Sequence, residues 1–333
     1  MARYSSDQNK VWGISESGTY AAPMAGSAFW IGQVQSNSID DKENKIETRY
    51  MGTSSRSVST FDEGVRDVTG TISTRVTDMR MPFYAIGSVT STSGTNTLHR
   101  ATEIGTDVQQ NPFVSGTGNL NPPLSFTLED SKQAPGTGRN FIRTIQGCIP
   151  TAVTLTTSSS EVVTADIDYI GQTLAFTSGN TTSGAVLATK PYTFGNTALT
   201  VAGSSLTAKE VSFEINQNTE APHYLNGSRD IAAPYQGNRE YSLSITMDLD
   251  SSMAASLYNQ YYKSTSTFNS VLDFDKDSAT TGSQHAIFTF SGCHIVSMDN
   301  PSEVEGVTES TVEIKAENLS AVEYNKVASF LPY

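Results

Sequence analysis

The sequence predicts a mainly β protein made of two tandem copies of one domain. Residues 237–250 alternate apolar and polar side chains, which is typical of a strand with one buried face. Residues 64–76 repeat this alternation, and both stretches begin with Gly-x-Arg followed by an acid. Charged residues make up only 17% of the chain, while Ser, Thr, Asn and Gly are abundant. This composition favours sheets joined by loops.

Other motifs recur in the same order, which indicates an internal duplication. The segment Phe141–Ile149 resembles Ile287–Ile295, and each contains Gly-Cys. The strand motif recurs after 173 residues, from Gly64 to Gly237, and the Gly-Cys motif after 145, from Gly147 to Gly292. Unequal spacing places insertions between the motifs of the first copy. We therefore predict an N-terminal arm (1–27), a first domain (28–175, with a surface insertion at about 87–139), a linker (176–189) and a second domain (190–333).

Each copy is expected to carry a flanking helix and a long loop. One or two helical turns are predicted at 77–86, and a helix capped by Ser251 is predicted to run to Tyr262. The stretches 40–59 and 216–234 are long for hairpin loops, so they are either solvated or docking loops. The N-terminal arm is expected to be extended and to pack on a neighbour or on its own domain.

Charge and motifs exclude several classes of function. A net charge of −13 argues against a main activity of gripping nucleic acid through Lys and Arg. No long apolar run or secretory leader pattern occurs, so neither a membrane span nor a signal peptide is expected. The two cysteines occupy matched positions and are predicted to be core residues. No catalytic, metal or cofactor motif is found, although a Ser/His/Asp triad stays open.

The polar faces of the duplicated strands carry an excess of acids. Seven acids and two bases lie opposite the apolar residues: Asp67, Arg75, Asp166, Asp168, Asp248, Asp250, Glu313, Lys315 and Glu317. This face is either an ordinary solvated surface or one past which a polyanion slides without sticking.

The order of these pieces resembles the tail tube proteins, or major tail proteins, of long-tailed phages and related archaeal viruses. The likeness spans about 190–324 and, more weakly, about 29–170. In the second copy it rests on these stretches: Pro191–Phe194, Val211–Asn216, the strand 237–250, Glu303–Gly306 and Thr311–Ala316.

The resemblance implies a non-enzymatic virion protein without cofactors or metals. Each domain would be a β-sandwich or partly closed barrel whose inner strands pair with those of neighbours. Stacked rings would form a hollow tube for genome ejection, commonly with six domains per ring. Because this chain has two copies, three chains would make one pseudo-hexameric ring. With four inner strands per domain, the 24-stranded barrel would be roughly 48 Å across.

The resemblance also implies sites and partners. Residues expected to face the lumen are Asp67, Asp166, Asp248, Asp250 and Glu313. Residues expected in inter-ring loops are Lys42, Glu43, Lys45, Arg49, Tyr50, Glu220, His223, Tyr224 and Arg229. Expected partners are further copies of the chain, the tape measure protein, the tail terminator, and baseplate or tip proteins. Viral DNA would pass without specific binding, no membrane would be involved, and the virion tail would assemble in the host cytoplasm.

Two other functions remain open from the residues. A tandem β-sandwich that decorates virions or binds carbohydrate would need a groove of exposed aromatics, and the tight group Tyr258, Tyr261 and Tyr262 is explained by helix packing. A β-rich hydrolase would need paired carboxylates in a cleft, and Asp166 with Asp168 is a common strand pattern. A saline habitat would also produce an acid excess.

Overall fold

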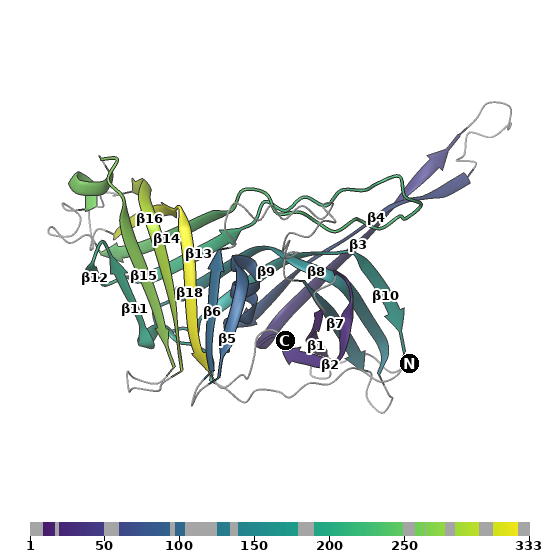
Figure 1. The fold of residues 1–333 in the computed structure, drawn as a ribbon, viewed down its shortest axis with the longest axis horizontal. Helices are drawn as coiled ribbons and strands as arrows, with labels where there is room; N and C mark the ends of the chain where they lie inside the picture. Colours follow the sequence, from purple (N-terminus) through teal and green to yellow (C-terminus); the bar gives the residue numbers. More distant parts are fainter. Residues whose placement is uncertain are drawn as a thin grey trace.

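The computed structural model describes residues 9–16, 20–49, 60–93, 97–103, 125–133, 139–178, 190–248, 257–262, 264–276, 284–299 and 309–325. Antiparallel strands dominate these ranges (Figure 1), which confirms the mainly β prediction.

The elements fall into two series along the chain. The first half contains β1 (Lys10–Glu16), β2 (Pro23–Trp30), β3 (Gln33–Thr48), β4 (Thr60–Arg75), α1 (Arg80–Ile86), β5 (Gly87–Thr92), β6 (Thr97–Glu103), β7 (Phe126–Gln133), β8 (Arg139–Ser158), β9 (Thr164–Gly171) and β10 (Thr173–Thr177). The second half contains the 3-10 turn η2 (Phe194–Asn196), β11 (Thr197–Val201), β12 (Ser204–Leu206), β13 (Glu210–Asn216), β14 (Glu240–Asp248), the π-helical turn η3 (Leu257–Tyr262), β15 (Phe268–Asp275), β16 (His285–Asp299), β17 (Glu309–Ala316) and β18 (Asn318–Asn325).

One continuous sheet, here called the shared sheet, runs through both halves. Its strand order is β3-β4-β9-β8-β13-β14-β17-β16, with four strands from each half. The halves meet where β8 pairs with β13, from Ser158 opposite Glu210 to Ala152 opposite Asn216. The chain therefore already joins two four-stranded units edge to edge by backbone hydrogen bonds.

Two outer sheets pack on the apolar face of the shared sheet. The first has the order β2-β1-β7-β8-β10, and the second has the order β12-β11-β15-β16-β18. The alternating pattern of β13 and β14 buries every second side chain between the layers. Phe213 of the shared sheet lies 4.8 Å from Phe288 of the second outer sheet, measured between ring centroids. The core thus lies between layers, as in a sandwich.

The strands of the two outer sheets pair in the same order. β8 and β16 are long strands that each begin in an outer sheet and continue into the shared sheet, and they cross between the sheets at equivalent positions. Each bends at a glycine with positive φ, Gly147 at 68° and Gly292 at 65°. This conformation favours glycine because it has no Cβ. The following Cys148 and Cys293 are buried, and each thiol donates to the carbonyl three residues earlier at 3.5 Å. The prediction of core cysteines is confirmed.

Parts of the N-terminal arm and of the predicted insertion form strands. Residues 10–16 and 23–30 form β1 and β2 of the first outer sheet, and Trp12 is buried. Within the predicted surface insertion, 87–103 forms the β5–β6 hairpin, whose Val89 and Ala101 are buried. The hairpin pairs with β18 and covers its edge, which would otherwise present unpaired backbone groups. A segment of the first half therefore extends the second outer sheet.

Residues 40–48 of the predicted loop 40–59 belong to a strand, and residues 50–59 lie outside the described ranges. β3 continues to Thr48 and β4 starts at Thr60, while the last β9 partner of β4 is Gly171, opposite Val68. Beyond Val68, β3 and β4 pair in the sheet only with each other, and they project from the body as an arm (Figure 1) whose base contacts the connection 217–239. The extension is held by the antiparallel pairing of the two strands, which continues to Thr48 opposite Thr60.

Helix α1 confirms the helical turns predicted at 77–86, and all seven of its residues are buried. In the second half, residues 249–256, including the predicted cap, lie outside the described ranges. The part that is described, Leu257–Tyr262, is a π-helical turn and not an α-helix. It places the Tyr261 ring 4.7 Å from that of Phe268.

A buried polar cluster joins the two halves. Glu323 of β18 is fully buried and accepts hydrogen bonds from the Met79 backbone N–H at 2.9 Å and the Tyr192 hydroxyl at 2.7 Å. The Lys276 ammonium donates to the Thr77 carbonyl and lies 4.5 Å from the Tyr192 ring centroid. Buried charges are stable only when paired and hydrogen-bonded. This cluster therefore holds β15 and β18 against the segment that precedes α1.

The cluster predicts a pH-dependent stability. Burial, together with the neighbouring carboxylate of Asp78, raises the pKa of Glu323 from 4.5 to about 7. Burial also raises the pKa of Asp78, against the opposing effect of Arg80 and Lys276. Between about pH 4.5 and pH 7, Glu323 therefore stays protonated in the folded chain but releases its proton in the unfolded chain. The stabilisation is therefore full below about pH 4.5 and is lost as the pH rises through about 7.

We expect the free energy of unfolding of the unassembled chain to fall by ~1–3 kcal/mol between about pH 5 and pH 8. Urea denaturation at a series of pH values measures this change. Glu323→Gln is neutral at every pH and should flatten the profile. A wild-type stability that rises over this range would contradict the assignment.

Candidate functional site

The outer sheets leave the polar face of the shared sheet uncovered. Registered pairs carry one row of side chains across seven strands: Ser73, Asp166, Thr154, Glu214, Ser242, Lys315 and His294. The next row contains Arg75, Thr164, Thr156, Ser212, Ser244, Glu313 and Ser297. Hydroxyl groups therefore dominate the face, with charges placed among them.

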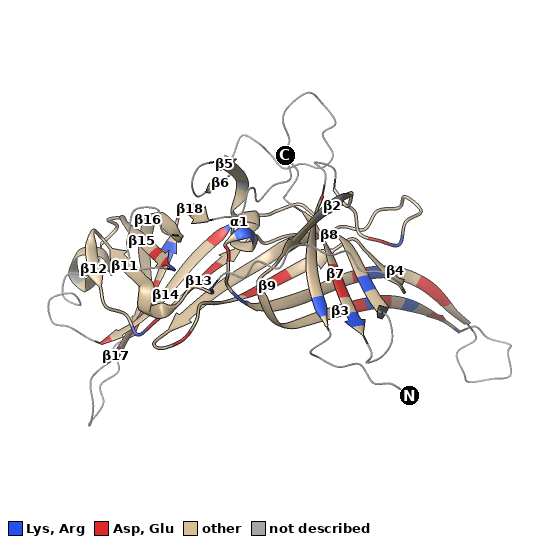
Figure 2. Ribbon diagram, turned by 90° about the horizontal axis from the view of Figure 1, so that it is seen from below, with Lys and Arg blue, Asp and Glu red and all other residues tan. Residues whose placement is uncertain are grey.

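Acids outnumber bases on this face among the residues that the structure describes. The acids include Asp166, Asp168, Glu210, Glu214, Glu240, Asp248, Asp299, Glu309 and Glu313, and the bases include Arg75, Lys209 and Lys315. Figure 2 shows acidic residues along β9 and mixed signs along β3 and β4. This excess of acids gives the face a negative potential.

Contacts on the face hold these side chains in place. The Lys209 ammonium lies 2.5 Å from both Asp248 and Glu309, and these two carboxylates raise the pKa of Lys209. Hydroxyl groups of Ser73 and Thr71 donate to Asp166 and Asp168 at 2.5 Å. The acids of β9 therefore have hydroxyl partners, so their negative charge is not neutralised by a cation.

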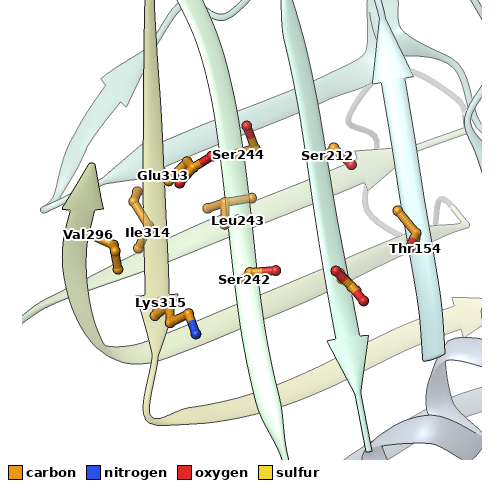
Figure 3. Close-up of a pocket in the computed structure, with 10 residues that line it drawn as sticks. Thr154, Ser212, Ser242, Leu243, Ser244, Val296, Glu313, Ile314 and Lys315 are labelled. Carbon is orange, nitrogen blue, oxygen red and sulfur yellow. The ribbon is translucent and has the colours of Figure 1, made fainter. Parts of the chain in front are cut away.

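The face is hollowed where the halves meet. A hollow of about 290 Å³ lies over β8, β13, β14 and β17 and is lined by Thr154, Ser212, Glu214, Ser242, Ser244, Glu313 and Lys315, among others (Figure 3). The lining polar groups are dispersed hydroxyls and charges, with no paired carboxylates arranged around a nucleophile. A concave polar face of this kind has the form of the inner wall of a curved sheet.

Three of the five residues predicted to face a lumen, Asp166, Asp248 and Glu313, lie together on this face. Asp67 lies apart from them at the base of the arm, where His223 contacts its carboxylate at 3.0 Å and Asn44 donates to it at 3.4 Å. Asp250 lies outside the described residues.

Sequence reasoning missed several acids of the face, among them Glu210, Glu214, Glu240, Asp299 and Glu309. The signal was present for the first two, because Val211, Phe213 and Ile215 alternate with them and are buried. Glu240 and Glu309 are the first residues of their strands. Each has a buried strand residue on only one side, so the alternation of apolar and polar residues identifies its face less clearly.

The predicted inter-ring residues come together along the arm. Lys42, Glu43 and Lys45 belong to β3 and Arg49 follows it, whereas Tyr50 is not among the described residues. Glu220, His223, Tyr224 and Arg229 belong to the connection 217–239 between β13 and β14. Figure 1 shows this connection running from the body toward the arm. The two predicted loops are thus neighbours in one chain.

Arg229 is the centre of that contact. Its guanidinium donates to the Gly64 carbonyl at 2.8 Å and to Glu63 at 2.7 Å, and it lies 3.9 Å from Glu43. The backbone N–H of Arg66 donates in turn to the Arg229 carbonyl at 2.9 Å. These contacts hold the connection 217–239 against the base of the arm. In the single chain, Arg229 and His223 therefore make contacts within the chain.

The arm and its neighbouring loop expose large apolar side chains. Phe61 is 62% exposed and Ile46 is 56% exposed, and they lie on opposite faces of the arm. Leu225 and Tyr224 project from the connection 217–239. An isolated two-stranded ribbon is only marginally stable in water, and clustered exposed apolar groups mark contact surfaces.

Both edges of the shared sheet are open in the described part of the chain. β3 pairs only with β4, and the segment His294–Asp299 of β16 pairs only with β17. Val296, on this open segment, is 53% exposed. Each edge can accept another antiparallel strand.

Within the described ranges, no group of three or more His, Cys, Asp or Glu could hold a metal ion. None of the described helices is long and apolar enough to cross a membrane.

Comparison with known proteins gives the family. No curated protein matches the chain. One solved structure, described as the structure of Hcp1 from Flavobacterium johnsoniae, matches 38% of this chain and 93% of its own length, with 19% identity and a TM-score of 0.27. A family model described as phage tail tube protein matches residues 13–317, which is most of the chain. The chain belongs to the phage tail tube protein family.

Proposed function

We propose that three copies of this chain close into a ring, and that stacked rings form the bore through which the viral genome is ejected. Membership of the family makes the chain a structural, non-enzymatic component of the virion tail that assembles with itself into a tube. The observation that carries the finer proposal is the shared sheet, which joins two four-stranded units within one chain and leaves both outer edges open.

Strand number supports three chains per ring. Eight strands from each of three copies give 24, which at ~4.8 Å spacing and ~40° tilt make a barrel roughly 48 Å across. Side chains would narrow the bore to roughly 35 Å, which still admits a DNA duplex. In this arrangement β16 of one copy pairs with β3 of the next, and no sheet edge remains unpaired.

The pairing registers support an internal duplication and hence pseudo-sixfold symmetry. Thr71 faces Asp168, and Ser244 faces Glu313. These pairs are related by shifts of 173 and 145 residues, the same shifts that relate the recurring sequence motifs. The bulges after Pro150 and Ile295 are also 145 residues apart. Two halves of equal register could occupy alternate positions of a ring.

The polar face would line the bore. Its acids repel phosphate groups and its hydroxyls interact with water, so DNA would pass without specific binding. The opposite face is apolar and buried, so it is not available to a lumen.

Reversing the charge of this face should make the tube retain DNA. With Glu214→Lys and Glu313→Lys, each ring would gain cations that neutralise phosphates, and binding should weaken steeply with salt. Co-sedimentation of assembled tubes with short duplex DNA measures the effect.

The matched control is Glu214→Gln with Glu313→Gln, which removes the same acids without adding cations and should retain little DNA. Equal DNA retention by wild-type and Lys-substituted tubes would argue against a luminal position of this face.

The arm and the connection 217–239 would contact the next ring, since their apolar groups are exposed in the single chain. The ends of the tube would meet the tape measure protein, the tail terminator and the baseplate or tip proteins. Assembly would take place in the host cytoplasm.

Negative-stain electron microscopy of the purified chain over a concentration series tests the function. We expect rings with threefold or pseudo-sixfold end views and hollow tubes at high concentration. A chain that stays monomeric at high concentration, even with virion partners present, would overturn the proposal and favour a decoration or carbohydrate-binding module.

A further inference from the structure

The contact between the two halves of one chain provides a template for the contact between chains. At that contact, two side chains of the second half bond the end of α1. The Gln217 amide donates to the Ala85 carbonyl at 2.7 Å, and the Arg239 guanidinium donates to the Ile86 carbonyl at 2.7 Å. The last carbonyls of a helix have no partner within it, so these bonds satisfy groups that would otherwise be unpaired.

The first half carries a close counterpart of Arg239. Arg66 follows Gly64 as Arg239 follows Gly237, and in β3–β4 it faces Glu43. The two glycines have equivalent surroundings. A Cβ on Gly64 would meet the Asn44 carbonyl oxygen, and one on Gly237 would meet that of Asn218. Asn44 and Asn218 are 174 residues apart, the shift that relates β3 to β13.

The second half carries a counterpart of α1. α1 packs on β8, and η3 packs on β16. Tyr84 of α1 contacts Phe126, with ring centroids 6.5 Å apart, and Tyr261 of η3 contacts Phe268 at 4.7 Å. Phe126 faces Cys148, and Phe268 faces Cys293. Matching Tyr84 with Tyr261 makes Tyr262, the last residue of η3, the counterpart of Ala85 of α1.

We propose that Arg66 of one chain donates to the Tyr262 carbonyl at the end of the Leu257–Tyr262 turn of the neighbouring chain, much as Gln217 and Arg239 donate to the end of α1 within the chain. This rests on the proposed ring. The same equivalence predicts the register in which β3 of one chain pairs with β16 of the next. Within the chain, Asn216 of β13 lies opposite Ala152 of β8. The equivalent pair between chains is Lys42 of β3 opposite Ser297 of β16.

The side chain of Arg66 is prepared for this role. Its Nε and Nη2 donate to the two Asp41 oxygens at 2.8 Å, which fixes the guanidinium and leaves Nη1 to face another acceptor. Glu43 stands where Gln217 stands in the second half, and a carboxylate cannot donate to a carbonyl. Arg66 is therefore the donor that this contact between chains would use.

The first test compares Arg66→Ala with Arg239→Ala in the full chain. Arg66→Ala should raise the concentration needed for ring formation roughly ten- to hundredfold, because a charge-assisted hydrogen bond is lost at every contact between chains. The melting temperature of the unassembled chain should change little, since the pair with Asp41 is partly exposed. Arg239→Ala should instead lower that melting temperature.

A cysteine pair tests the register without weakening the contact. Lys42→Cys combined with Ser297→Cys should give disulfide-linked dimers and trimers of the chain on mild oxidation. The control pair, Ser38→Cys with Ser297→Cys, is displaced by four residues, or roughly 13 Å, and should not cross-link.

The outcomes separate the two proposals. This inference is overturned if the Arg66→Ala chain forms rings at the same concentration as the wild-type chain, or if the control cysteine pair cross-links. Either result leaves the ring proposal intact. If the wild-type chain forms no rings, the proposed function fails, and this inference fails with it.

Discussion

Replacing Lys276 by methionine is expected to destabilise the folded chain by about 3–5 kcal/mol, because it leaves buried carboxylates without their cation. Lys276 is 9% exposed and Glu323 is fully buried, and both Asp78 and Glu323 interact with its charge. Methionine keeps an apolar side chain over the Tyr192 ring. The loss of stability would therefore come from removing the ammonium charge and from leaving the Thr77 carbonyl without its hydrogen-bond donor.

Guanidinium denaturation of the unassembled chain at about pH 8 measures this change. The loss should shrink at about pH 5, because the carboxyl groups whose pKa is raised then take up protons. Lys315→Met is the matched control: Lys315 pairs with Glu240 at 2.9 Å on the solvated face, and its loss should cost less than ~1 kcal/mol. Equal effects of the two substitutions would show that the buried cluster does not hold the halves together.

The second large effect is expected at the arm. Ile46→Ser combined with Phe61→Ser should prevent rings from stacking, while rings still form. Fully burying a large apolar side chain contributes ~1.5–3 kcal/mol, and every arm of a ring would lose this contribution twice. Because both residues are more than half exposed in the single chain, its own stability should change by less than ~0.5 kcal/mol.

Tube length distributions from electron micrographs measure stacking, and sedimentation measures ring formation. The control, Ile46→Val with Phe61→Leu, keeps apolar area and should give tubes of nearly normal length. Long tubes from the serine variant would mean that rings stack through another surface.

Local patterns in the sequence predicted much of the fold. Alternation placed β14 correctly, because a half-buried strand shows every second side chain on its buried face. The Gly-Cys motifs identified two matched core cysteines, and the structure shows that each motif also forms a bend at a glycine with positive φ. The recurring motifs gave the shifts that the strand registers later reproduced.

Long-range pairing was not predictable in the same way. Nothing within 87–103 indicates that β6 pairs with β18, because a hairpin sequence does not identify the distant edge that it covers. The charged stretch of β3 was interpreted as a loop because both of its faces are solvated and alternation is absent. The burial of Glu323 depends on partners from three distant segments.

The candidate site was predicted in part. Strand alternation identified Asp166, Asp248 and Glu313 as members of one polar surface, but it could not show that this surface crosses from one half to the other. That continuity depends on the pairing of β8 with β13. Asp67 shows the limit of the method, since its strand continues past the sheet into the arm, where His223 contacts it.

The measurement that tests the central claim most directly is a cryo-electron microscopy reconstruction of tubes assembled from the purified chain. We predict three chains per ring, a closed inner barrel in which β16 of each chain pairs with β3 of the next, and a bore lined by Asp166, Glu214 and Glu313. A wall in which these residues face outward, or in which the edges of the shared sheet remain unpaired, would contradict this account.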